Sequence, residues 1–194
     1  LTADDLRIIK ILCDITLTMI EGELMQADRT GSLDVSEPEH LEIIRRKTAM
    51  LFSGCGRVAA ELSALPAERA RALEAYALNL GMAYQLIDDL LDFTARESEL
   101  GKPVLSDLKE GKLTLPLILL LSAIRPEEKK LIETGLGDRS FSRIAPQEIL
   151  DLVRAEGTLE EVREMAEGWA SRAKQELAFF PAGYARDALE VAPD

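Results

Sequence analysis

The sequence predicts an all-α protein built as an antiparallel helical bundle. Apolar residues recur every three or four positions through most of its 194 residues, and no run of alternating polar and apolar residues indicates a strand. Capping boxes and prolines divide this pattern into helices with short connections, which favours antiparallel neighbours. Hydrophobic residues make up 47% of the chain and charged residues 30%, enough apolar content for a packed core. We therefore expect residues 1–194 to belong to a single all-α domain.

The expected helices follow from these start and stop signals. The first long helix ends before the polar stretch around Gly31, and the second begins at the capping box formed by Ser36 and Glu39. Residues 96–112 contain two glycines and a proline among charged residues, which predicts an irregular loop of functional length. Together the signals place helices at about 3–27, 36–62 and 66–93, then from 114, 126, 146 and 158 onward, with a final helix reaching 191.

Charge and composition exclude several classes of function. The chain has 23 Lys and Arg against 35 Asp and Glu, a net charge of −12, which disfavours nucleic acid and anionic membrane surfaces as partners. No apolar stretch approaches the roughly 20 residues of a transmembrane segment. The two cysteines, Cys13 and Cys55, form neither a disulfide framework nor a zinc motif. These features predict a cytoplasmic protein.

An acidic motif lies near the end of the third long helix. Asp88, Asp89 and Asp92 share one helical face with Gln85, because they lie three or four positions apart. Like charges at this spacing destabilise a helix, and carboxylates among apolar residues call for a cation. Oxygen ligands without nearby His or Cys favour Mg²⁺, which shares its coordination shell with phosphates. The alternative is a solvated acidic face at a helix end.

Positive charge surrounds this motif in the sequence. Lys102 lies between Gly101 and Pro103, and Lys112 follows another glycine, so the backbone can approach a ligand and an ammonium group can bind phosphate. Lys47 offers a further ammonium beside the hydroxyl of Thr48. Each lysine alone is also compatible with an ordinary solvated surface residue. The combination with the acidic motif predicts a metal–diphosphate site.

Three glycines and one histidine lie outside these motifs. Gly54, Gly56 and Gly81 lie within predicted helices, where each either permits close helix approach or breaks the helix locally. His40 lies near a helix amino terminus among glutamates, and we expect it to be solvated and without a catalytic partner.

The ordered set of motifs resembles the trans-isoprenyl diphosphate synthase (polyprenyl synthetase) family. The resemblance rests on Lys47-Thr48-Ala49, on Tyr84-Gln85 followed by the DDLLD motif, and on GKPVLSDLKEGKLTLP from Gly101 to Pro116. The segment Gly22-Glu23-Leu24 resembles the corresponding helix of bacterial medium- and long-chain, octaprenyl-type enzymes.

This resemblance implies an all-α fold of the isoprenoid synthase type around a deep apolar cavity, and a homodimer. It implies that Mg²⁺ holds the diphosphate of an allylic substrate while this substrate ionises, and that isopentenyl diphosphate attacks the allylic cation. The resemblance assigns Lys47, Asp88 and Lys102 as catalytic residues, Asp88, Asp89 and Asp92 as the metal motif, and Lys47, Thr48, Gln85, Lys102 and Lys112 as diphosphate-binding residues.

The chain departs from the family in one respect. Family members carry two aspartate-rich motifs, whereas this sequence contains one and begins at Leu1 within amphipathic sequence. We therefore expect the carboxyl-terminal portion of a synthase, incomplete at its amino terminus and inactive alone, with the missing segment possible as a separate chain. A non-catalytic helical subunit of a synthase remains an alternative. A class I terpene or squalene-type synthase is a second alternative, which the lysine-containing segment 101–112 disfavours.

Overall fold

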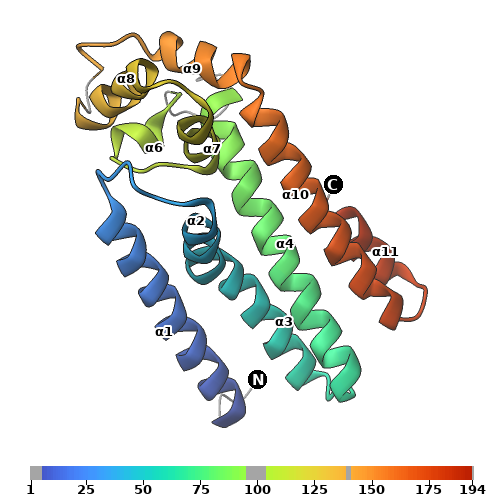
Figure 1. Cartoon of the computed structure of the whole chain (residues 1–194). Helices are drawn as coiled ribbons and strands as arrows, with labels where there is room; N and C mark the ends of the chain where they lie inside the picture. Colours follow the sequence, from blue (N-terminus) through green and yellow to red (C-terminus); the bar gives the residue numbers. More distant parts are fainter. Residues whose placement is uncertain (1–5, 95–103, 139–140, 194) are drawn as a thin grey trace. The chain divides into compact units, whose positions relative to one another are not determined.

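The computed structural model describes residues 6–94, 104–138 and 141–193, which fold into helices without a strand (Figure 1). The all-α prediction is thus confirmed, and most helix limits lie within a few residues of those expected. The elements are α1 (Leu6–Arg29), α2 (Glu37–Ile44), the π-helix η1 (Arg45–Ala49), α3 (Met50–Leu62), α4 (Ala67–Thr94), α6 (Ser106–Lys109), α7 (Leu115–Ala123), α8 (Pro126–Gly137), α9 (Pro146–Ala155), α10 (Thr158–Glu176), the 3₁₀ helix η2 (Leu177–Phe179) and α11 (Tyr184–Val191).

Two local findings differ from the sequence-based expectation. The predicted second helix contains the π-helix η1, where five residues form a widened turn between α2 and α3. The segment predicted to be irregular contains the short helix α6. The prolines behave as expected, since Pro126 and Pro146 each lie in the first turn of their helix, where a missing N–H group costs no hydrogen bond.

Contacts divide the chain into two compact units. Unit 1 contains Leu1–Leu24, Glu42–Gln85 and Met165–Asp194, and unit 2 contains Met25–Leu41 and Leu86–Glu164. In unit 1 the successive helices α1, α3 and α4 run in alternating directions (Figure 1). In the same unit, Tyr76 and Ala77 of α4 pack against Ala173 of α10 and Leu177 of η2. The antiparallel arrangement predicted from the short connections is therefore present in unit 1.

The core of unit 2 is formed by short helices around α7. Residues 115–120 of α7 are all buried, and α7 packs against α9 while α8 packs against both α6 and α9. A helix that is apolar on all sides must be surrounded by protein to be stable, which explains this central position. Among the described residues, no helix combines the length and the apolarity that a membrane span requires.

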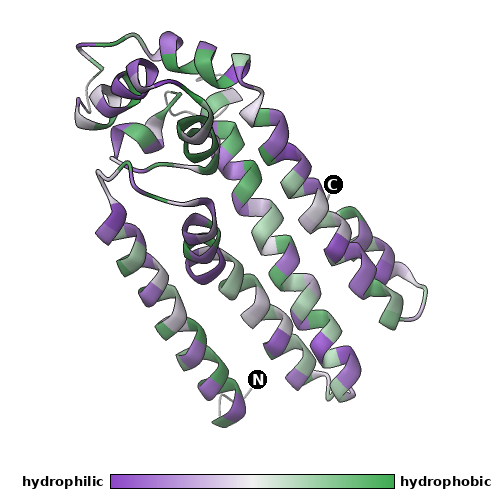
Figure 2. Ribbon diagram, viewed as in Figure 1, coloured by the Kyte–Doolittle hydropathy of each residue, from purple (hydrophilic) through white to green (hydrophobic). Residues whose placement is uncertain are grey.

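Helix α1 of unit 1 has two apolar faces. One face packs inward through Ile11 and Ile15. The other lies at the surface, and green hydrophobic turns recur along α1 in Figure 2. Its exposed apolar residues are Leu6, Ile9, Leu12, Leu17, Ile20 and Leu24. This face of α1 is therefore an apolar stripe that no other described element covers.

Candidate functional site

The three aspartates of the acidic motif have different surroundings in unit 2. Asp88 is exposed on α4, whereas Asp89 and Asp92 are only 2% and 8% exposed. A buried carboxylate requires hydrogen-bond donors, and both inward aspartates have them. The motif thus presents one carboxylate to solvent and keeps two inside the unit.

Asp89 is paired with the single histidine of the chain. Nε2 of His40 lies 2.8 Å from Oδ2 of Asp89, both side chains are almost fully buried, and the backbone N of Leu115 lies 3.5 Å from the same oxygen. The expectation that His40 is solvated is therefore wrong. No local pattern in the sequence indicates the pair, because its members lie 49 positions apart.

Asp92 connects α4 to the segment that follows. Its Oδ1 accepts hydrogen bonds from the backbone N–H and the hydroxyl of Ser106, at 2.8 and 2.7 Å, and its Oδ2 accepts the N–H of Asp107 at 3.3 Å. Its carbonyl oxygen accepts the N–H of Leu105, which has a positive φ of 58° and is fully buried. Such a backbone conformation is costly for leucine and persists only where the surroundings enforce it. Asp92 therefore fixes the start of α6.

Asp107 completes a group that we call the carboxylate cluster, formed by Asp88, Asp89, Asp92 and Asp107. Burial raises the pKa of Asp107 to about 6, and the negative charges of Asp92, Asp89 and Asp88 act in the same direction. Burial also raises the pKa of Asp92, although the hydrogen bonds from Ser106 oppose this shift. Lys112 favours the ionised form of Asp107, so its ammonium lies within electrostatic reach of the cluster. Carboxylates held against their mutual repulsion are typical of sites that bind a cation.

The other predicted residues lie in unit 1, in unit 2 or outside the described residues. Lys47 and Thr48 belong to the π-helix η1, and the hydroxyl of Thr48 donates to Oε1 of Gln85 at 2.8 Å. Nζ of Lys47 lies 2.8 Å from a carboxylate oxygen of Glu23. Lys102 lies outside the described residues. Lys112 belongs to unit 2, where its ammonium lies 2.6 Å from Oε2 of Glu110.

The carboxylate oxygens of the acidic motif fit a magnesium ion that also binds the phosphate oxygens of a ligand. Over the residues that the structure describes, no group of three or more His, Cys, Asp and Glu side chains could hold a metal ion by itself. Mg²⁺ rarely uses such an all-protein cage, because it retains waters and takes one or two carboxylates plus phosphate oxygens. The exposed carboxylate of Asp88 is suited to this kind of coordination.

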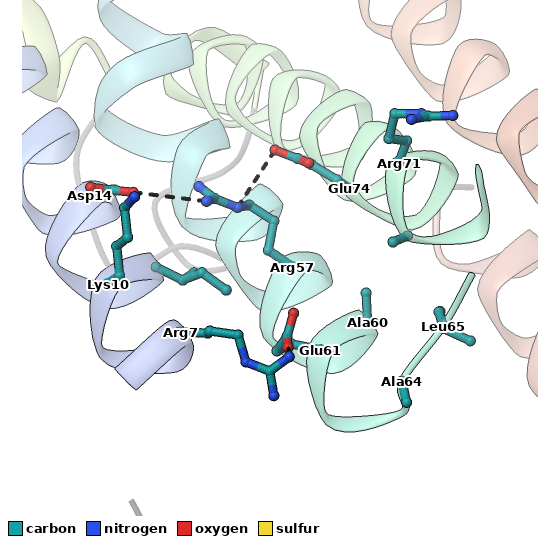
Figure 3. A pocket seen from close by; sticks show the side chains of 12 residues that line it. Arg7, Lys10, Asp14, Arg57, Ala60, Glu61, Ala64, Leu65, Arg71 and Glu74 are labelled. Atoms are coloured by element: carbon teal, nitrogen blue, oxygen red, sulfur yellow. Dashed lines mark ion pairs between the residues drawn. The ribbon is translucent and has the colours of Figure 1, made fainter. Parts of the chain in front are cut away.

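A cavity of about 690 Å³ lies elsewhere in unit 1, and none of the predicted site residues that the structure describes lines it (Figure 3). Its charged side chains face one another, since Arg57 extends between Asp14 and Glu74 at 3.9 and 3.8 Å. Arg7 forms an ion pair with Glu61 at the same cavity. Four basic and three acidic side chains line the cavity, so their charges nearly balance.

We predict that His40→Ala lowers the free energy of unfolding by about 2 to 4 kcal/mol, because the substitution removes the imidazole that hydrogen-bonds the buried carboxylate of Asp89. Urea denaturation would measure this loss. His40→Gln, which can restore an N–H donor, should recover part of the stability. Equal stability of the wild type and both variants would contradict a structural role for the pair.

We predict that Asp107→Asn stabilises the metal-free chain at pH 7 by about 1 to 2 kcal/mol, after allowance for solvent screening. The folded chain holds the Asp107 proton up to a pKa of about 6, above the ordinary value of 3.8, so its stability falls as the pH rises through this window. The free energy of unfolding of the variant should therefore exceed that of the wild type by the full amount above about pH 6, and the two should be equal below about pH 4. Thermal unfolding in EDTA across this range would measure it, with the exposed Asp34→Asn as a matched control. A difference that does not vary with pH would contradict the prediction.

The chain is similar to known proteins over most of its length. The sequence profile of the polyprenyl synthetase family matches residues 1–153. Octaprenyl diphosphate synthase of Escherichia coli (strain K12) is 34% identical over 184 residues, which are 95% of this chain and 57% of that protein. Geranylgeranyl diphosphate synthase of Sulfolobus acidocaldarius is 37% identical over 134 residues, covering 69% of this chain and 41% of the relative.

A solved structure agrees with these sequence relatives. The polyprenyl synthase of Caulobacter crescentus CB15, complexed with calcium and isoprenyl diphosphate, superposes with a TM-score of 0.89 at 34% identity, covering 98% of this chain and 58% of that structure. The chain thus spans between 41% and 58% of the lengths of these three relatives. Its fold is that of the polyprenyl synthases. Because the family profile matches most of its residues, the chain belongs to the polyprenyl synthetase family.

Proposed function

We propose that this chain supplies the diphosphate-holding part of a polyprenyl diphosphate synthase, a transferase that condenses an allylic diphosphate with isopentenyl diphosphate. The observation that carries the proposal is the family match over residues 1–153, because every residue predicted for the site falls within it. In this reaction the bond between the allylic carbon and its diphosphate breaks, the double bond of isopentenyl diphosphate attacks the resulting cation, and the adduct loses a proton.

The residues of each unit have a distinct part in this proposal. Lys47 contributes an ammonium group and Thr48 a hydroxyl for the diphosphate oxygens. The Thr48 hydroxyl, which donates its one proton to Gln85 in this structure, turns to the ligand when diphosphate binds. In unit 2, Asp88 provides an exposed metal ligand, while Asp89 and Asp92 support the motif from within through His40 and Ser106. Lys102 and Lys112 add positive charge for the allylic diphosphate. Preorganised charge of this kind stabilises the negative charge that develops on a departing diphosphate.

Mg²⁺ is the proposed cofactor, and when bound it neutralises charge on the diphosphate leaving group. The polyprenyl synthase of Caulobacter crescentus was solved with calcium and isoprenyl diphosphate, which supports a divalent cation beside a prenyl diphosphate in this family. The hard carboxylate oxygens of Asp88, Asp89 and Asp92 are of the type that Mg²⁺ prefers.

We propose a cytoplasmic homodimer that makes a medium- or long-chain product. The exposed apolar stripe of α1 supports self-association, because a contiguous apolar surface of this kind gains free energy when it is covered. The match to an octaprenyl diphosphate synthase over 95% of this chain supports the longer product.

Magnesium-dependent pyrophosphate binding by the purified chain tests the proposal. We predict that Asp88→Asn weakens the affinity about 10-fold or more, because it removes the exposed carboxylate while leaving buried contacts intact. Isothermal titration calorimetry with inorganic pyrophosphate, with and without Mg²⁺, measures the effect. Asp151→Asn, an exposed helical aspartate in the same unit, is the matched control and should bind as the wild type does. Absence of magnesium-dependent binding by the wild type would overturn the proposal and favour a non-catalytic subunit.

We also predict that the 194-residue chain alone does not incorporate isopentenyl diphosphate into longer prenyl products. Its sequence carries one aspartate-rich motif, so it supplies about half of the carboxylates that the family resemblance implies for charge compensation. A radiolabelled incorporation assay with Mg²⁺ and an allylic diphosphate would measure turnover. Turnover by the chain alone would contradict the need for a second motif, although it would support prenyl transfer.

A further inference from the structure

The π-helix η1 lies in unit 1 at the residues proposed to bind diphosphate. Its five residues, Arg45–Ala49, form a widened turn in a helix that continues into α3, since the flanking residues Ile44 and Met50 both have right-handed helical conformations. A π-helix is rare and occurs mostly as a single turn inside an α-helix, frequently at a functional site. The wide turn changes the direction of the side chains that it carries, here Lys47 and Thr48. The position of this turn relative to its neighbours therefore decides where these two side chains lie.

Two glycines on two different helices supply space for this turn. A Cβ atom on Gly22 of α1 would lie 2.6 Å from the backbone N of Lys47 and 2.8 Å from Cβ of Arg46. A Cβ atom on Gly81 of α4 would lie 2.7 Å from Cα of Ala49. Separations below 3.0 Å to backbone atoms cannot be relieved by rotating a side chain. Both helices can therefore approach the π-turn this closely only with glycine at these positions.

The same two helices also hold the functional side chains of the turn. Glu23, next to Gly22, lies 2.8 Å from the ammonium of Lys47. Gln85, one turn after Gly81, accepts the hydroxyl of Thr48 at 2.8 Å. On each side of the turn, a close backbone approach is thus followed by a polar contact to one of its two functional residues. Displacing either helix would disturb the contact as well as the turn.

We propose that Gly22 and Gly81 are positioning residues, which set the place of Lys47 and Thr48 by allowing α1 and α4 to contact the π-turn backbone. This inference rests on the proposed function, because it concerns the binding of diphosphate by Lys47 and Thr48. A role in packing alone would change only stability, whereas a positioning role also changes the affinity for the ligand.

The chain offers two matched controls within helices. A Cβ atom on Gly56 of α3 would lie 2.8 Å from the carbonyl oxygen of Leu73, a comparably tight contact that does not involve the π-turn. Gly168 of α10 has no neighbouring atom within 4 Å of such a Cβ. Gly56→Ala therefore reports the cost of tight packing alone, and Gly168→Ala reports the intrinsic preference of helices for alanine.

The experiment measures urea midpoints and the affinity for magnesium pyrophosphate by calorimetry. We expect Gly22→Ala, Gly81→Ala and Gly56→Ala to lower the urea midpoint, and Gly168→Ala to maintain or raise it. We expect the affinity to fall about 10-fold or more in Gly22→Ala and Gly81→Ala and to stay within about 2-fold in both controls. In a Lys47→Ala background, the glycine substitutions should weaken binding much less, because the group that they position is absent.

The outcomes separate this inference from the proposed function. Loss of affinity in Gly56→Ala equal to that in Gly22→Ala and Gly81→Ala would overturn the inference, as would wild-type affinity in the latter two variants. Failure of the wild type to bind would overturn the proposed function itself. Should a variant unfold, trimethylamine N-oxide restores the compact state without removing the steric conflict, so the affinity is then measured in this osmolyte for all variants.

Discussion

The free energy needed to bury charged carboxylates governs the organisation of unit 2. Asp89 and Asp92 are removed from water, which is unfavourable unless donors replace the lost hydration. His40 supplies one donor from the α2 helix, and Ser106 and Asp107 supply others from the start of α6. These hydrogen bonds join three separate segments of unit 2 through the end of α4. Asp88 remains at the surface of a helix end that its buried neighbours hold in place.

A different constraint acts on unit 1. Lys47 and Thr48 lie on a π-turn, and this turn is compatible with close neighbours only where side chains are absent. The hydroxyl of Thr48 donates its one proton to Gln85 in this structure, so it must exchange this hydrogen bond to bind an acceptor oxygen of a ligand. Preorganisation in the two units therefore has different physical origins, namely hydrogen bonding to buried carboxylates in unit 2 and close backbone packing in unit 1.

Local signals were sufficient for most of the helices but not for the environment of the site. Capping boxes and prolines predicted where the helices begin, since these signals depend on residues within one turn. The π-turn escaped prediction because one widened turn leaves the apolar pattern of a continuous helix almost unchanged. The burial of His40 was not predicted, because its partner, Asp89, lies 49 positions away in the sequence. The three-and-four spacing of the aspartates placed them on one face, but it could not show that two of them would be covered by segments from elsewhere in the chain.

Two energetically unfavourable features of unit 2, a strained backbone conformation and a buried carboxylate, lie close together along the chain. Leu105 has a positive φ, and the pKa of Asp107, two residues later, is raised by burial and by the surrounding carboxylates. Natural sequences retain such unfavourable features chiefly where function requires them. A divalent cation would relieve the repulsion among the carboxylates, and a diphosphate bound through that cation would also be attracted by the ammonium of Lys112, which here pairs with Glu110. A cation and a diphosphate bound together satisfy both charges, so each ligand should raise the affinity for the other. The electrostatics of unit 2 thus support the metal–diphosphate complex that we propose.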